Sequence, residues 1–126
     1  MESKVLVVDD EESILRILRI MLERELYEVY TAINAEVALD ILQDEKYEFD
    51  LIITDVVMPR MNGYELGLHI LEKKPSMPIL FISGFNSSRE LMNLIQSHTN
   101  LEYQSKPFGF NDIKSKINKI FNSTSP

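Results

Sequence analysis

Residues 51–59 read LIITDVVMP, and this stretch decides the fold class. It opens with the short apolar run Leu51–Ile53, which shows no alternation of apolar and polar residues. Such a run is typical of a strand buried on both faces, as in a parallel sheet. The run is followed by Thr54 and then by an acid, Asp55. Four other segments are strand candidates, the first two equally apolar and the last two weaker and expected nearer the sheet edges: Val5–Val8, Ile79–Ile82, Val29–Ala32 and Leu101–Gln104.

Apolar residues at helical spacing separate these runs. Asn34 is a plausible N-cap for the second helix, and Pro75 closes the third. Strand and helix alternate five times, which predicts an α/β fold: a doubly wound, five-stranded parallel sheet with five helices on its two faces. The helical stripes run from Ile14 to Leu22, Ala35 to Leu42, Leu66 to Leu71, Leu91 to Ile95 and Ile113 to Phe121.

Bulk composition excludes several classes of protein. The 126 residues suit one domain, which we expect over residues 1–121, with 122–126 as a tail or the start of a linker. The net charge of −7 argues against direct nucleic-acid binding, and the absence of cysteine excludes disulfides and thiolate sites. No window approaches the ~18 apolar residues of a membrane span, so we expect no membrane insertion and a cytoplasmic location.

Polar side chains follow the ends of the strand candidates. Asp9 and Asp10 follow the first, Asp55 the third, Ser83 the fourth and Lys106 the fifth. All strands of a parallel sheet point the same way, so these side chains should meet at one edge. That edge is where open α/β sheets bind ligands.

This set of side chains has a specific chemistry. Carboxylates ~4 Å apart repel by about 1 kcal/mol per pair in water, and by more where water is excluded. A divalent cation such as Mg²⁺, which prefers oxygen ligands, would offset the repulsion. Lys106 would supply a positive charge and Ser83 a hydrogen bond to a phosphate oxygen. The pattern therefore predicts that Asp55 is a nucleophile that accepts a phosphoryl group.

Each of these residues has a commoner role when taken alone. Asp10 or Glu11 would cap the following helix, and Asp55 would be a turn residue. Ser83 and Lys106 precede Gly84 and Pro107 in ordinary turn or loop sequences. Only their joint placement at successive strand ends favours the site.

We expect structural roles, and no role in a functional site, for two histidines and three lysines. His69 and His98 lie in helical stripes without partners at metal-ligand spacing, so we expect surface or packing roles. Lys114, Lys116 and Lys119 are expected to form a solvated helix face.

The sequence resembles the receiver domain of two-component response regulators, over roughly Ser3 to Phe121. The resemblance implies a flavodoxin-like sheet with strand order 2-1-3-4-5. The matching motifs are Val8-Asp9-Asp10-Glu11, Thr54-Asp55-Val56-Val57-Met58-Pro59, Asn62-Gly63, Ile82-Ser83-Gly84 and Lys106-Pro107-Phe108.

The resemblance implies a metal site beside the phosphoacceptor. By position, Asp55 matches the phosphorylated aspartate. Asp10 matches the acid that binds Mg²⁺ directly, and Asp9 the acid that does so through water. Val57 matches the residue whose backbone carbonyl completes the metal site.

The resemblance also implies a switch. Ser83 matches the switch hydroxyl and Lys106 the lysine that pairs with the phosphate. Tyr103 matches the aromatic switch residue that swings inward, and Pro107 a proline that often follows a cis peptide bond. The readout would be a shift of the surface made by the fourth helix, fifth strand and fifth helix.

Two apolar residues near the predicted site bear on the lifetime of the phosphate. Val57 and Phe85 occupy positions that influence how water attacks the acyl phosphate in this family. We hypothesise that these side chains restrict water and lengthen the phosphorylated lifetime.

The implied partners are a sensor histidine kinase or phosphotransfer protein and a downstream protein or attached effector domain. A homodimer formed on phosphorylation is left open. Any catalysis would be self-directed, namely phosphotransfer to Asp55 and its reversal by water, so the chain is not expected to be an enzyme. Two alternatives are a phosphate-independent docking module and an aspartyl phosphohydrolase, although Val57 cannot supply the acid that such hydrolases place two residues after the nucleophile.

Overall fold

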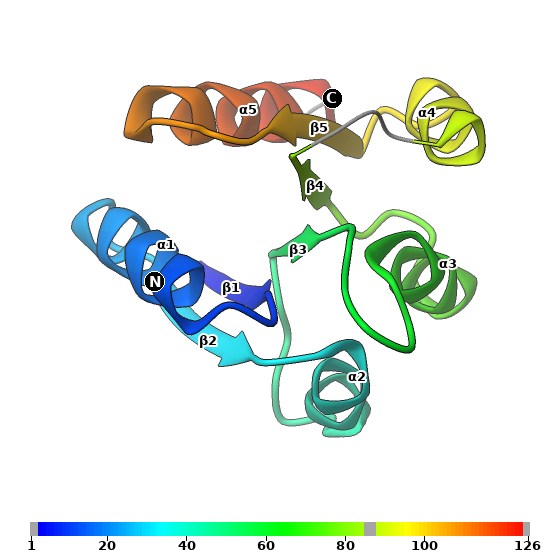
Figure 1. Ribbon diagram of the computed structural model, residues 1–126, viewed down its shortest axis with the longest axis horizontal. Coiled ribbons are helices and arrows are strands. Elements are labelled where there is room, and N and C mark those ends of the chain that lie inside the picture. Colours follow the sequence, from blue (N-terminus) through cyan, green and yellow to red (C-terminus); the bar gives the residue numbers. More distant parts are fainter. Residues whose placement is uncertain (1–2, 85–87, 125–126) are drawn as a thin grey trace.

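The computed structural model describes residues 3–84 and 88–124 of the chain. In this part, five strands alternate with five helices (Figure 1). Their bounds are β1 Lys4–Val8, α1 Glu12–Arg24, β2 Glu28–Ala32, α2 Ala35–Gln43, β3 Leu51–Asp55, α3 Gly63–Lys73, β4 Ile79–Ser83, α4 Arg89–Gln96, β5 Leu101–Ser105 and α5 Phe110–Thr124.

The strands form one sheet in the order β2-β1-β3-β4-β5, and every neighbouring pair is parallel. The predicted α/β class and the strand order are therefore confirmed. The two weaker strand candidates, β2 and β5, are the edge strands, as expected. The direction in which the chain adds strands reverses between β1 and β3, which makes the carboxyl ends of these two strands the expected ligand crevice.

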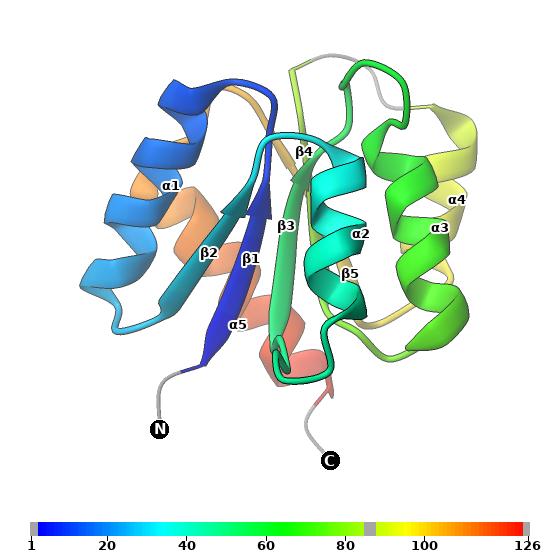
Figure 2. The same cartoon turned by 90° about the horizontal axis from the view of Figure 1, so that it is seen from below.

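Helices cover both faces of the sheet. Figures 1 and 2 show α1 and α5 on one face and α2, α3 and α4 on the other. The side chains of β1 alternate accordingly: Val5 and Val7 pack in the core beneath α1 and α5, whereas Leu6 and Val8 pack in the core beneath α2 and α3. Every residue of β3 and β4 is buried, because both faces of these central strands are covered.

Local signals at the helix ends explain where the helices start. The Asn34 side chain accepts a hydrogen bond from the Val37 N–H at 2.8 Å, which confirms the predicted N-cap of α2. Asn62 and Glu65 form a reciprocal capping box at the start of α3, which satisfies two backbone N–H groups there.

Helix α5 is longer than the sequence pattern indicated. It continues to Thr124, whereas a tail was expected from residue 122. The last residues, Asn122 to Thr124, are polar and carry no apolar stripe, so periodicity could not mark them as helical. Within the described residues, no helix combines the length and the apolar character that crossing a bilayer requires.

Candidate functional site

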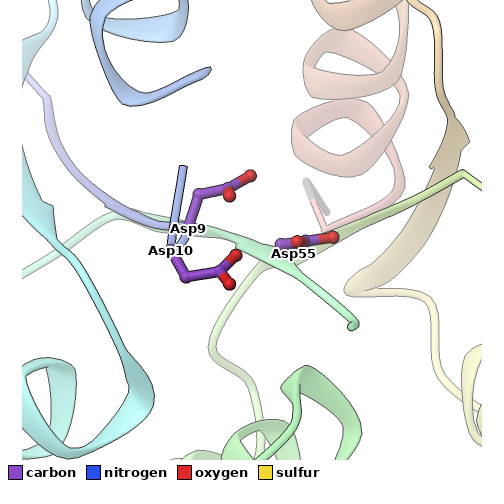
Figure 3. Close-up of side chains that lie close together, drawn as sticks. All are labelled: Asp9, Asp10 and Asp55. Atoms are coloured by element: carbon purple, nitrogen blue, oxygen red, sulfur yellow. The ribbon is translucent and has the colours of Figure 1, made fainter. Parts of the chain in front are cut away.

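The carboxyl ends of β1 and β3 bring three carboxylates together. Asp9 and Asp10 follow β1, Asp55 ends β3, and one carboxylate oxygen from each lies within 4.8 Å of the others (Figure 3). Asp9 and Asp55 are 2% and 5% exposed, whereas Asp10 is open to solvent. The convergence expected from the strand ends is therefore present, with two members of the cluster held away from water.

Lys106 supplies the positive charge of this cluster. Its Nζ lies 3.4 Å from an oxygen of Asp55 and 3.5 Å from an oxygen of Asp9. The lysine follows β5, and its backbone N–H donates to the Ser83 carbonyl at 2.9 Å, which ties its loop to the end of β4. One ammonium thus faces two buried carboxylates, and the cluster keeps an excess of negative charge.

The Asp9 side chain is fixed by the backbone that follows it. Its oxygen accepts a hydrogen bond from the Glu11 N–H at 2.9 Å. Glu11 occupies the N-cap position of α1, but its side chain makes no capping bond. The simpler interpretation, in which Glu11 serves as a side-chain cap, is therefore wrong.

Asp55 is held by close backbone packing against α3. The Gly63 N–H donates to the Val56 carbonyl at 2.8 Å, and a Cβ at Gly63 would collide with the Asp55 carbonyl oxygen. The Thr54 hydroxyl donates to that same carbonyl at 2.9 Å. The glycine of the Asn62-Gly63 pair is therefore needed for the close approach of α3 to the acid.

Burial and charge shift the titration of all three paired groups. Burial raises the pKa of Asp9 to about 6, with the Glu11 N–H opposing and the Asp55 charge reinforcing the effect. Burial also raises the pKa of Asp55, although Lys106 partly offsets it. Burial lowers the pKa of Lys106, but the Asp9 and Asp55 carboxylates outweigh it and the net shift is upward. Burial thus makes the ionised form of both carboxylates unfavourable, and a bound cation would stabilise that form.

The donor set fits a hard divalent cation. All the converging atoms are carboxylate oxygens, the ligand type that Mg²⁺ prefers, and Mg²⁺ commonly keeps several waters while using one or two carboxylates. The spread of 4.8 Å among ligand oxygens leaves room for such a partly hydrated ion.

Ser83 and Tyr103 come from the neighbouring strands β4 and β5. Ser83 is buried at the end of β4, where it pairs in register with Ser105. Tyr103 in β5 is half-buried against the α2–α3–α4 core, and its hydroxyl donates to the Ser83 carbonyl at 3.4 Å. The structure therefore brings the two predicted switch residues together through a direct contact.

Three further predicted features concern the loops around the cluster and the lifetime of the phosphate. Val57 lies in the loop after β3 with its side chain 70% exposed, and its backbone N–H helps to hold the Asp55 carboxylate charged. Phe85 lies outside the described residues, so the lifetime hypothesis stays a prediction. The Lys106-Pro107 peptide bond is cis, as the resemblance implied.

His98 and the three lysines of α5 have structural contacts, whereas His69 lies at the surface. The ring of His98 bonds to the Leu94 carbonyl at 2.9 Å near the end of α4, which confirms a packing role. His69 is exposed on α3. The α5 lysines form ion pairs at 3.2–3.6 Å: Lys114 with Glu25, and Lys116 and Lys119 with Glu102.

Sequence reasoning missed two supports of the site. Gly63 was noticed only as part of a motif, although an Asn-Gly pair shortly after a strand-end acid is a readable signal for a tight approach. The hydrogen bond from the Glu11 N–H to Asp9 could not be predicted from the sequence, because nearly every residue has a backbone N–H donor whatever its side chain.

Comparisons with known proteins agree with this geometry. The family model of the response regulator receiver domain matches residues 5–118. The chain is 34% identical over 120 residues to the alkaline phosphatase synthesis transcriptional regulatory protein PhoP of Bacillus subtilis, covering 95% of this chain and 49% of PhoP. It is 35% identical over 112 residues to the two-component response regulator ARR10 of Arabidopsis thaliana, covering 89% of this chain and 20% of ARR10. The chain thus spans half or less of the length of these relatives.

Solved structures show the same fold. The response regulator protein TrrA of Thermotoga maritima, crystallised in complex with Mg²⁺–BeF, superimposes with a TM-score of 0.80 at 33% identity, over 94% of this chain and 98% of that one. The chemotaxis protein CheY4 of Vibrio cholerae gives a TM-score of 0.81 at 30% identity, over 95% of this chain and 99% of that one.

Proposed function

Because the chain belongs to the response regulator receiver family, we propose that it is a phosphorylation-dependent signalling switch in which Asp55 accepts a phosphoryl group. The observation that carries the proposal is the position of Lys106 Nζ, 3.4 Å from Asp55 and 3.5 Å from Asp9. A buried acid that shares one ammonium with a second buried acid, with a third acid close by, suits the binding of a metal and a phosphoryl group together.

The reaction starts with attack by an Asp55 carboxylate oxygen on the phosphorus of a phosphohistidine. The new O–P bond forms as the N–P bond to the histidine breaks, and the departing imidazole keeps the electron pair. Lys106 lies where it offsets negative charge on the phosphoryl oxygens. Burial raises the pKa of Asp55, and because Lys106 opposes that shift it also helps to keep the nucleophile ionised.

Asp9, Asp10 and Asp55, with the Val57 carbonyl, would hold Mg²⁺. When bound, the ion supplies positive charge beside the phosphoryl oxygens. The protein's own contribution is to bury two of the three acids in advance, with Lys106 offsetting their repulsion only in part, so that a bound cation would relieve the rest.

The switch would be read through Ser83 and Tyr103. The phosphate adds ~1.5 to 2 negative charges and three acceptor oxygens, which would draw the Ser83 hydroxyl and Lys106 towards it. Tyr103 donates to the Ser83 carbonyl, so a shift of Ser83 changes a bond that Tyr103 makes. The affected surface is made by α4, β5 and α5, which would meet a downstream protein or an attached effector domain.

The partners that fit this function are a histidine kinase or phosphotransfer protein as donor, and an output that senses the α4–β5–α5 surface. PhoP and ARR10 are longer than the matched region, and their names describe regulators.

Intact-mass measurement after incubation with Mg²⁺ and a small phosphodonor tests the proposal. One phosphate adduct should form on the wild type and disappear completely in Asp55→Asn. The matched control is Asp50→Asn, which removes an exposed acid directly before the amino end of β3, the strand that ends in Asp55. Absence of any adduct would favour a phosphate-independent docking module, and repeated release of phosphate from unrelated esters would favour a hydrolase.

A further inference from the structure

A cleft opens between α2 and α3 at the end of the sheet opposite the acid cluster. Phe49 and Met77 line it and shortly precede β3 and β4, which places the cleft at the amino ends of the strands. Its volume is about 360 Å³. Clefts that bind small molecules in proteins have volumes of roughly 300–1,000 Å³, so the space is sufficient for one.

The cleft follows from how the two helices stand on the sheet (Figure 2). In their amino-terminal halves the buried contacts include small residues, Ala35 and Ala38 in α2 and Gly63 and Gly67 in α3, which allow close packing. In their carboxyl-terminal halves the residues that face the cleft are larger and often only partly covered, such as Leu42. A gap between the helices therefore remains at that end.

Aliphatic and aromatic residues form one pre-organised wall of the cleft, and the other residues that line it are polar or charged. Tyr47 and Phe49 stack with ring centroids 6.0 Å apart, and the Tyr30 ring meets each of them edge-on at 5.0 and 5.5 Å. Leu39 and Ile70 contribute aliphatic surface from the two helices. Phe49 is only 7% exposed and Lys46 Nζ lies 5.3 Å from the Tyr47 ring centroid, so the rings form a rigid aromatic wall that a planar ligand would meet chiefly at Tyr47.

The rim of the cleft carries positive charge. Lys73 and Lys74 lie at the carboxyl end of α3 on this rim, with one acid, Glu72, beside them. Neither lysine forms an ion pair with a carboxylate among residues 3–84 and 88–124. In a chain with a net charge of −7, a rim with two such ammonium groups selects an anion.

We propose that the α2–α3 cleft binds a small planar aromatic carboxylate, with its ring against Tyr47 and Phe49 and its carboxylate towards Lys73 and Lys74. The apolar wall accounts for the aromatic body of the ligand and the rim for its charge. This site is separate from the phosphoacceptor end and does not depend on the function proposed for Asp55.

The probe is 2-naphthoate, titrated into ¹⁵N-labelled protein, with the neutral isostere 2-naphthamide as its matched ligand. Amide shifts should saturate, and the perturbed residues should lie in α2, α3 and the segment 44–50. The double variant Lys73→Gln/Lys74→Gln should weaken naphthoate binding about fivefold and leave naphthamide binding unchanged. The double variant Lys116→Gln/Lys119→Gln removes the same charge from α5, away from the cleft, and should leave both ligands unaffected.

Three results would overturn the proposal. The first is an absence of saturation up to about 5 mM naphthoate. The second is an equal loss of affinity for both ligands in the Lys73/Lys74 variant, which would remove the role of charge. The third is a shift of the same amides with rising protein concentration alone, which would identify a second copy of the chain as the occupant.

Discussion

The two ends of the sheet differ in what they leave unsatisfied. At the carboxyl end, Asp9 and Asp55 are buried as charged groups with one lysine between them. At the amino end, the α2–α3 cleft leaves apolar side chains without a full set of neighbours. The carboxyl end therefore has more buried negative charge than positive charge, and the amino end has a space that side chains do not fill.

The difference determines how each end responds to its surroundings. Electrostatic strain depends on pH and on cations, because both change the charge on the carboxylates. A packing defect depends on the volume of the side chains around it and hardly at all on pH. Mutations at the two ends should therefore separate into two classes by their pH dependence.

The largest expected effect comes from removing packed side chains. Leu66 of α3 is fully buried, whereas Leu42 of α2 is half-buried beside the cleft. Leu66→Ala should lower the free energy of unfolding by about 3–4 kcal/mol, the usual range for a core leucine. Leu42→Ala should cost only about 1 kcal/mol, because its side chain already borders empty space. Denaturant unfolding at pH 7.5 and pH 5 measures both, and the two losses should not change with pH.

Equal losses for Leu66→Ala and Leu42→Ala would contradict the comparison, since they would mean that the cleft is closed in solution. A loss that varied strongly with pH would contradict it too, because neither leucine belongs to the cluster of titrating acids.

A smaller effect of opposite sign is expected at the acidic end. The pKa of Asp9 is about 6 in the folded chain, against the ordinary aspartate value of 3.8, which applies when the chain is unfolded. The folded state therefore binds more protons between these pH values, and stability falls as pH rises through that window. Asp9→Asn removes the cost of burying the charge and should stabilise the protein by about 1–2 kcal/mol at pH 7.5 without Mg²⁺.

The pH profile distinguishes this explanation from others. The gain from Asp9→Asn should shrink as pH falls and vanish by about pH 3, where the wild-type acid is protonated in the folded state and largely so in the unfolded state. Asp40→Asn, on the exposed face of α2, removes the same charge without any burial and should change stability by less than about 0.5 kcal/mol. If Asp9→Asn were destabilising at pH 7.5, the hydrogen bond that Asp9 accepts from the Glu11 N–H would outweigh the desolvation cost.

The same contrast explains what the sequence could predict. The acidic end was predictable because a parallel sheet sends the residues after all its strands to one edge. Asp9, Asp55, Ser83 and Lys106 could therefore be assembled from linear spacing alone. Which of the two consecutive acids is buried was not predictable. Asp9 and Asp10 carry the same side chain, and only the path of the chain into α1 gives them different surroundings.

The other end left little signal in the sequence. The cleft depends on how far α2 and α3 stand from the sheet and on where Tyr47 and Phe49 fall in the connection before β3. Apolar periodicity identified Leu39, Leu42 and Ile70 as core-facing but not as incompletely covered. The end of α5 at Thr124 was missed for a related reason, because its last turn has no apolar face.

The smallest predicted effect tests whether the charge deficit at the acidic end is a metal site. Mg²⁺ that binds only the folded state, at about five times its dissociation constant, should raise the free energy of unfolding of the wild type by about 1 kcal/mol. Asp10→Asn should abolish this gain without other cost, because Asp10 is exposed and Asp9 and Asp55 keep Lys106 as their partner. The gain should also shrink below about pH 6, since protons then compete for Asp9. Thermal unfolding with MgCl₂, compared with NaCl at equal ionic strength, measures both dependences. A gain that persists in Asp10→Asn or at pH 5 would mean that Mg²⁺ binds the acidic surface in general and not the cluster. The carboxyl end of the sheet would then carry buried charge without being a specific metal site.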